Sequence, residues 1–364
     1  MRPYPLLFKP IYKEALWGGA RMKGLFGREL PHDKVAESWD ISCRKNEMSV
    51  VDNGALAGER FIDIINGDPV SVLGSGIYTP DYTAFPLLAV IIDAMMDLSV
   101  QVHPGCEYSI KHEGEPFGKD EMWYIAEAPQ GASIILGLRD GVTREELDGA
   151  LARSEVGGAL SYLKVSKGDV INVPAGLVHA ITAGILVFEI QNNVDVTYRM
   201  YDYGRLGADG KPRRLDIGKA LDVIDYSGKL KKTAVPGLTV RESGYEATYY
   251  IANTSYAIER LRISGGAGMA SDPGRFHILS CMAGGCSIVS AAGVTEAIAG
   301  NSVFIPAGLG EYTVNGRCEL LKSYVPDIIK DFIDPLLKYG YTPDDIAAST
   351  DCSLGDLALQ RGFF

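Results

Sequence analysis

The sequence has no excess of positive charge and no long apolar run. Its 35 Lys and Arg residues are outnumbered by 46 Asp and Glu residues, which gives a formal net charge of -11. Nucleic acids and anionic membrane surfaces bind basic proteins, so we expect neither as a partner. The longest apolar run, Pro86 to Ile92, is stopped by Asp93 and is too short to span a membrane.

Paired cysteines are also missing, because none of the six cysteines belongs to a C-x-x-C motif. The first residues, MRPYPLLFKPIYKEALW, have a short apolar stretch broken by lysines and do not resemble a signal peptide. In a chain of 364 residues without an export signal, reduced thiols are the default. We therefore expect a cytoplasmic protein.

Glycine and proline, by contrast, are abundant, and they separate short segments rich in β-branched and aromatic residues. The 42 glycines and 18 prolines favour an antiparallel sandwich or barrel over a helical fold. Thr143 and Glu146 form a capping box that predicts a short helix, and a second helix is expected over Leu215 to Ile224. From Asp327 the composition is helical again, with a cap expected at Thr342-Pro343.

A ten-residue pattern occurs twice. Gly168 to Leu177 reads GDVINVPAGL, and Gly300 to Leu309 reads GNSVFIPAGL. Both copies lie between strand-like segments, which favours duplication of a β-domain over chance. The first copy continues to His179, whereas the second continues to Glu311. We therefore predict that the first copy carries the chemistry and that the second is scaffold.

Four residues are candidate metal ligands. Gln101 and His103 are two residues apart, so on a strand their side chains point to the same face. Glu121 precedes the apolar run Met122-Trp123-Tyr124, which we expect to form the next strand of a hairpin, and His179 opens another strand. A carbonyl oxygen, two imidazoles and a carboxylate suit Zn²⁺, with Mn²⁺, Co²⁺ or Fe²⁺ as alternatives.

The remaining histidines lack such company. His32, His112 and His277 are expected to be ordinary surface or core residues. His103 alone would be interpreted in the same way. Because it occurs together with Gln101, Glu121 and His179, we favour its interpretation as a metal ligand.

Eight motifs in order carry a resemblance to a known family. They are LWGG at Leu16, ESWDIS at Glu37, FPLL at Phe85, IDA at Ile92, LSVQVHP at Leu98, GKDEMWY at Gly118, VPAGLVHA at Val173 and TYRMYDYGR at Thr197. In this order they are similar to the type I phosphomannose isomerases, metal-dependent members of the cupin superfamily, and specifically to their short bacterial form.

The resemblance implies a mainly β fold of tandem cupin (jelly-roll) domains with a few short helices and a helical C-terminal tail. We place a catalytic metal-binding cupin domain with N-terminal strands at residues 1–230 and a second cupin domain without metal ligands at residues 231–325. Residues 326–364 form a tail of unknown role, which lies outside the resemblance. We expect a monomer or a homodimer.

The resemblance also assigns roles to residues. It implies that Gln101, His103, Glu121 and His179 bind one metal ion per chain, usually zinc, although some short members of the family use only the last three.

Five more residues match the substrate pocket of the family. Ser99 and Lys119 match positions that line the sugar-phosphate pocket, and Asp195 and Arg199 match an acid and an arginine near the reacting carbons. Trp17 would wall the pocket. Lys119, Asp195 and Arg199 are the candidate catalytic residues, and Ser99, Lys119 and Trp17 the candidate substrate-binding residues. Without the motifs, all five would be interpreted as core, loop or surface ion-pair residues.

The implied activity is the metal-dependent interconversion of mannose 6-phosphate and fructose 6-phosphate through a cis-enediol intermediate. The identity of the general base stays open, and the candidates are a metal-bound water, Lys119 and Asp195. Val90 and Gly105 depart from the Lys and Asp that the family often has there, which leaves the substrate preference open. The alternatives are an isomerase or epimerase of another sugar or sugar phosphate, and a non-catalytic sugar-binding regulatory cupin.

Overall fold

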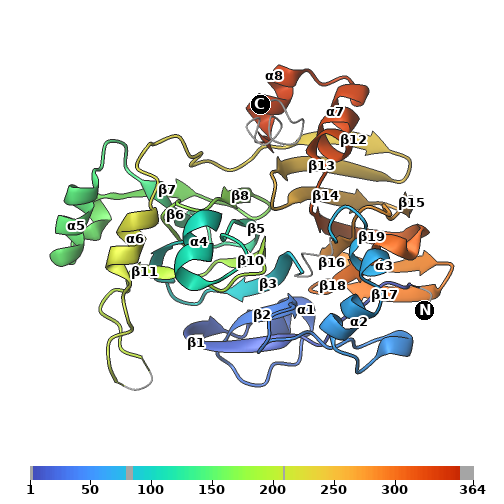
Figure 1. Ribbon diagram of the computed structural model, residues 1–364, viewed down its shortest axis with the longest axis horizontal. Helices are drawn as coiled ribbons and strands as arrows, with labels where there is room; N and C mark the ends of the chain where they lie inside the picture. The colour runs from blue at the N-terminus through green and yellow to red at the C-terminus, as the bar shows by residue number, and fades with distance from the viewer. Residues whose placement is uncertain (1–2, 79–84, 208–209, 353–364) are drawn as a thin grey trace.

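The predicted mainly β fold is confirmed. The computed structural model describes residues 3–78, 85–207 and 210–352, and its strands form three sheets that are antiparallel apart from one short parallel pairing (Figure 1). Strands of the first two sheets come from residues 11–201, and those of the third from residues 238–352. The domain limits near residues 230 and 325 stay predictions, and residues 353–364 of the predicted tail lie outside the described residues.

The first sheet lies at the centre of the protein and has six strands. In spatial order they are β1 (Ile11–Gly19), β2 (Val35–Ile41), β3 (Leu87–Asp93), β10 (Leu186–Asn192), β5 (Glu121–Glu127) and β8 (Val170–Val173). All seven residues of β3 and of β10 are buried, as expected of strands covered on both faces. Leu87 and Ile91 pack toward the third sheet, whereas Leu88 and Ile92 pack in the core shared with the second.

The second sheet shares a hydrophobic core with the first. Its strands in order are β11 (Tyr198–Tyr201), β4 (Val100–Val102), β9 (His179–Ala180), β6 (Ser133–Leu138) and β7 (Leu160–Lys164). Val100 and Val102 pack with Leu147 of α5 and Leu221 of α6, which cover one face. Strand alternation therefore turns Gln101 to the other face, toward the first sheet.

The third sheet surrounds a hydrophobic core of its own. Its main strands in order are β12 (Leu238–Glu242), β13 (Tyr245–Ala252), β14 (Ala257–Ile263), β19 (Glu311–Tyr324), β16 (His277–Ser290) and β17 (Gly293–Ile298), and β15 (Gly266–Ala270), β18 (Ser302–Ile305) and β20 (Asp351–Cys352) pair at its sides. In both copies of the sequence repeat a strand ends just before the proline, and the next begins at His179 or Glu311.

Helices are short and connect or cover the sheets. They are α1 (Arg21–Phe26), α2 (Phe61–Gly67), α3 (Pro69–Leu73), α4 (Cys106–Glu113), α5 (Arg144–Ala152), α6 (Ile217–Val223), a π-helix (Ile328–Ile333), α7 (Asp334–Tyr339) and α8 (Pro343–Ser349), with 3₁₀ turns at Gly54–Leu56, Val156–Gly158 and Ala307–Leu309. The predicted helices near residues 143 and 217 and the cap at Thr342 are confirmed, the first and last with complete capping boxes. Within the described ranges, no helix has the length and apolar character needed to cross a membrane.

An aromatic cluster joins α2 to the first and third sheets. The ring of Phe61, which is fully buried, lies 4.8 Å from that of Phe8 and 5.0 Å from those of Phe85 and Phe304, measured between centroids. Phe61→Ala is expected to lower the free energy of unfolding by about 3–5 kcal/mol, because it leaves a cavity among these rings. Denaturant unfolding monitored by circular dichroism measures the change. Leu25→Ala, at an exposed position, is the control, and a loss in Phe61→Ala no larger than in this control would contradict the prediction.

Candidate metal centre and substrate cavity

Three buried side chains converge on one point. Nε2 of His103 lies 3.2 Å from one carboxylate oxygen of Glu121, and Nε2 of His179 lies 3.3 Å from the other. The candidate ligand atoms of the three residues all lie within 4.8 Å of one another. Each side chain is 1% exposed, so water competes little for this point.

The first and second sheets both contribute to this point. His103 follows β4 and His179 opens β9 in the second sheet, whereas Glu121 opens β5 in the first. The predicted hairpin of the Gln101 and Glu121 strands is therefore wrong. Pro104 cannot continue the β-ladder, and α4 then carries the chain across to the other sheet.

Buried polar atoms at this point have unused bonding capacity. Within the part of the chain that the structure describes, Nδ1 and Nε2 of His103 and Oε2 of Glu121 make no hydrogen bond, although Nζ of Lys119 lies 3.3 Å from that oxygen. Leaving such atoms unpaired is costly. Nδ1 of His179 is held by the carbonyl of Leu177 at 2.8 Å, a partner typical of ligand histidines. The nitrogen and oxygen donors therefore fit a divalent transition metal.

The protonation states of the three residues also fit a metal. Burial lowers the pKa of His103 to about 3 and lowers that of His179. Burial alone would raise the pKa of Glu121, but the neighbouring Lys119 and the two imidazoles lower it far below its usual value. Neutral imidazoles and an ionised carboxylate are the forms that bind metal ions.

Gln101 lies beside the three but is oriented differently. It pairs with His179 across β4 and β9, and its Nε2 lies 3.3 Å from Nε2 of His179. Its Oε1 accepts a weak hydrogen bond from Ser99 Oγ at 3.5 Å. Rotating the amide by half a turn would exchange its nitrogen and oxygen and point the oxygen at the three-residue cluster. Its role as a fourth ligand stays a prediction.

A polar cavity of about 280 Å³ opens beside Glu121. Its lining contains every predicted site residue except the two histidines, namely Trp17, Ser99, Gln101, Lys119, Glu121, Asp195 and Arg199. Arg199, on β11, donates from Nε to Ser99 Oγ at 3.1 Å. Asp195 is exposed at the cavity. The structure describes both Asp195 and Arg199, and the two side chains form no ion pair with each other.

Lys119 is buried among carboxylates. Burial opposes its charge, but Glu121, Glu189, Asp195 and Glu37 together raise its pKa above the usual value. It is therefore a fixed cation at the metal-facing end of the cavity.

Several cavity residues were missed by the sequence analysis. Glu37 and Glu189 line the cavity and accept hydrogen bonds from the indoles of Trp39 at 2.7 Å and of Trp123 at 2.9 Å. Burial raises the pKa of both carboxyl groups. Glu189 could have been found from the sequence, because a charged residue between the apolar residues Phe188 and Ile190 is costly to bury unless it has a partner or a function. Arg213 also lines the cavity and had no such signal.

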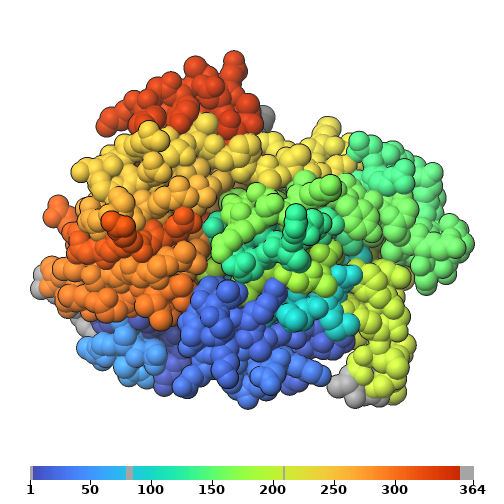
Figure 2. Space-filling view, turned by 180° about the vertical axis from the view of Figure 1, so that it is seen from behind, coloured from blue at the N-terminus to red at the C-terminus, as the bar shows by residue number. Residues whose placement is uncertain are grey.

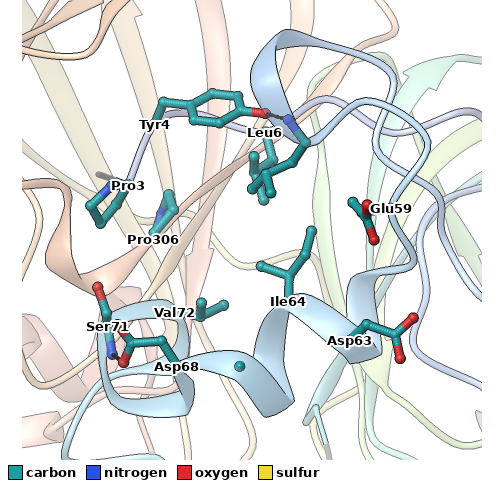
Figure 3. Close-up of a pocket in the computed structure, with 12 residues that line it drawn as sticks. Pro3, Tyr4, Leu6, Glu59, Asp63, Ile64, Asp68, Ser71, Val72 and Pro306 are labelled. Atoms are coloured by element: carbon teal, nitrogen blue, oxygen red, sulfur yellow. Dashed lines mark hydrogen bonds between the residues drawn. The ribbon is translucent and has the colours of Figure 1, made fainter. Parts of the chain in front are cut away.

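A second cavity, of about 360 Å³, lies between the N-terminal segment and α2 and α3 (Figure 3). Apolar side chains such as Leu6, Ile64 and Val72 line it, with acids near the edge. Two of these acids have structural partners, since Asp63 pairs with Arg60 and the side chain of Asp68 caps α3. None of the lining residues that the structure describes for this cavity is a histidine or cysteine, so it offers no counterpart of the His-Glu-His cluster.

The fold and the site together define a tandem β-domain protein of the cupin class, with a His-Glu-His cluster that opens into a polar cavity. Comparison with known families extends this result. The catalytic domain of type I phosphomannose isomerase matches residues 6–134, and the cupin domain of mannose-6-phosphate isomerase matches residues 245–325.

Individual relatives match along most of the chain. Mannose-6-phosphate isomerase ManA of Bacillus subtilis is 34% identical over 335 residues, covering 89% of this chain and 100% of that protein. The mannose-6-phosphate isomerase of Streptococcus mutans is 32% identical over 320 residues, covering 88% and 98%. The crystal structure of mannose 6-phosphate isomerase from Bacillus subtilis has a TM-score of 0.81 at 30% identity, covering 88% of this chain and 99% of that one.

The chain therefore belongs to the type I phosphomannose isomerase family and is an aldose–ketose isomerase. The predicted resemblance and enzyme class are confirmed.

Proposed function

We propose that the protein interconverts mannose 6-phosphate and fructose 6-phosphate, with one divalent metal ion, zinc first among the candidates, held by His103, Glu121 and His179. The observation that carries the proposal is the convergence of these residues beside a polar cavity. The cavity volume of about 280 Å³ is near the lower end of the roughly 300–1,000 Å³ range of ligand pockets, which suits a small substrate. We also propose a cytoplasmic enzyme that is a monomer or a homodimer.

Residues of the cavity supply most of what the reaction needs. When bound, the metal would polarise or orient the sugar oxygens as a Lewis acid. Lys119, kept cationic by its carboxylate neighbours, stabilises negative charge as it develops on the sugar oxygens of the cis-enediolate. Trp17 walls the cavity and helps to exclude water. Arg199 supplies a second cation to the cavity. Ser99, which Arg199 contacts, supplies a hydroxyl group.

The proton that moves between C2 and C1 is assigned to a carboxylate. Lys119 is a poor base because its raised pKa keeps it protonated. Of the carboxyl groups that line the same cavity, we propose Asp195 and Glu189 as the candidate carriers. Burial raises the pKa of Glu189 well above its usual value, toward the pH at which a general base works best.

A pair of isosteric variants tests the proton carrier. A base must be ionised, so kcat/KM falls as the pH drops through its pKa, and the raised pKa of Glu189 places this fall above the ordinary range of a glutamate. Replacing the carrier, by Glu189→Gln or Asp195→Asn, is expected to lower kcat by about 10²- to 10⁴-fold. If the carrier is Glu189, Glu189→Gln is also expected to remove this acidic limb. The pH profile of the coupled assay measures both effects. Glu155→Gln, at an exposed ion pair, is the control. A kcat that falls no further in either variant than in this control contradicts the assignment.

The overall proposal is tested by a coupled mannose 6-phosphate assay, with and without chelator, alongside elemental analysis. Turnover that is lost with chelator and restored by Zn²⁺ is expected. Turnover of other sugars or sugar phosphates alone would favour the isomerase or epimerase alternative. Ligand binding without turnover in metal-replete protein would favour a regulatory cupin. Full activity in demonstrably metal-free protein would overturn the role of the metal.

A further inference from the structure

Asp120 lies between Lys119 and Glu121 in the chain but does not line the polar cavity. We propose that Asp120 is a positioning residue for the metal centre, and that Ser255 of the third sheet holds Asp120 in place for this purpose. This inference rests on the proposed function, since it assumes that Glu121 and the two histidines bind a metal ion. It gives a part in metal binding to a sheet whose described residues do not belong to the His-Glu-His cluster.

A single turn, at residues 174–177, is hydrogen-bonded to both histidine ligands. The backbone N–H of Gly176 donates to the carbonyl of His103 at 2.9 Å. The carbonyl of Leu177 holds Nδ1 of His179 at 2.8 Å. The position of this turn therefore affects where both imidazoles lie.

The side chain of Asp120 connects the same turn to the third candidate ligand. Oδ1 of Asp120 accepts a hydrogen bond from the backbone N–H of Ala175 at 2.9 Å. The backbone of Asp120 is fixed at the end of β10, because its N–H donates to Oδ1 of Asn192 at 3.0 Å and its carbonyl accepts from the N–H of Asn192 at 3.1 Å. Glu121 is the next residue and opens β5. The carboxylate of Asp120 thus sets the distance between Glu121 and the turn that holds the histidines.

The other oxygen of this carboxylate is bound from the third sheet. Oγ of Ser255, in the turn between β13 and β14, donates to Oδ2 of Asp120 at 2.8 Å. That turn is itself held, because Oδ1 of Asn253 accepts from the N–H groups of Ser255 and of Tyr256, each at 2.8 Å. The gold strands of the third sheet lie against green segments of the first two sheets (Figures 1 and 2). Asp120 is therefore held from both sides of this joint, and rotation of its carboxylate would break a hydrogen bond.

A second contact at the same joint does not involve Asp120. The hydroxyl group of Tyr256, whose side chain is fully buried, donates to Oδ1 of Asn172 on β8 at 2.9 Å. Nδ2 of Asn172 donates in turn to Oδ2 of Asp351 at 2.8 Å. Because these bonds join the sheets independently, we expect the fold to survive removal of the hydrogen bond between Ser255 and Asp120.

The test is the dissociation constant of Zn²⁺, measured by competition between the metal-free protein and a chromophoric chelator, with circular dichroism as the check of folding. Asp120→Ala is expected to raise this constant by about 10- to 100-fold, which is the usual cost of losing a group that holds metal ligands in place. Asp169→Ala is the matched control, because Asp169 also accepts from a backbone N–H, that of Ser166 at 2.8 Å, in a turn outside the polar cavity. A dissociation constant no higher in Asp120→Ala than in this control would overturn the inference.

A conservative variant separates positioning from charge. Asp120→Asn keeps an oxygen that accepts from the N–H of Ala175 and adds an amide group that donates to Oγ of Ser255. It is therefore expected to restore most of the Zn²⁺ affinity that Asp120→Ala loses. Binding as weak in Asp120→Asn as in Asp120→Ala would mean that the aspartate acts through its negative charge, and it would overturn the positioning role.

Ser255→Ala tests the part played by the third sheet. It is expected to raise the dissociation constant of Zn²⁺ by about 2- to 10-fold, because it removes one hydrogen bond of Asp120 and leaves the bond to Ala175. Ser290→Ala, which removes a hydroxyl group from a hairpin of the same sheet, is the control. Equal constants in these two variants contradict the role of the third sheet, and they refute the whole proposal if Asp120→Ala does not fold.

The outcomes also distinguish this inference from the proposed function. Zn²⁺ binding that does not depend on His103 would contradict the proposed metal site. Binding that depends on His103 but not on Asp120 would contradict the positioning role alone. Asp120-dependent Zn²⁺ binding without turnover of mannose 6-phosphate would contradict the isomerase proposal alone.

Discussion

Replacing His103 by alanine is expected to remove most of the bound metal and to lower isomerase activity at least about 100-fold in the same preparation, because even outer-shell changes cost 10- to 100-fold. Among the residues that the structure describes, His103 is one of three side chains whose ligand atoms converge, and its two ring nitrogens make no hydrogen bond to any of them. Elemental analysis and the coupled assay on one sample measure both quantities. Glu121→Ala is expected to behave in the same way.

His32→Ala is the matched control, since it removes an imidazole from an exposed position outside the cavity. It should keep both metal and activity. The prediction fails if His103→Ala loses activity while its metal content stays at the level of this control, because the histidine would then act other than as a ligand.

Replacing Lys119 by methionine is expected to lower kcat by about 10²- to 10³-fold while leaving metal content unchanged. Methionine is close to lysine in length but removes the cation that four neighbouring carboxylates hold in its charged form. That cation is therefore missing when negative charge develops on the sugar oxygens. Steady-state kinetics and elemental analysis separate this loss from the loss in His103→Ala, in which metal and activity fall together.

Lys167→Met is the control for Lys119, because that lysine pairs with Glu127 at the surface and lies outside the cavity. A loss of metal from Lys119→Met in proportion to its loss of activity would contradict the predicted role. It would mean that the lysine acts by holding Glu121, from which it lies 3.3 Å away.

Local patterns allowed much of the site to be predicted. Gln101 and His103 follow from strand alternation, and His179 from the strand that opens after its turn. The pairing of strands was not predictable in this way, because hydrogen bonding between distant segments leaves no local trace. Glu121 was therefore placed correctly at the start of a strand but in the wrong sheet.

Glu189 and Arg213 show two different reasons for missing a residue. Glu189 could have been found, because it is a charged residue between the apolar residues Phe188 and Ile190 of a strand. Arg213 sits in a polar segment, and nothing in its neighbours marks it. Its guanidinium group is held beside the cavity by hydrogen bonds to Asp202, and this contact cannot be read from the neighbours of Arg213 in the sequence.

The placement of Glu121 in one sheet and of His103 and His179 in the other has a mechanical consequence. An ion bound by all three would cross-link the first and second sheets, so that metal affinity and the packing of these sheets against each other become parts of one free energy. A substitution far from the cavity that lets one sheet slide against the other would then loosen the ion without touching a ligand. In this architecture, selection for high metal affinity is therefore also selection for rigid packing between the two sheets.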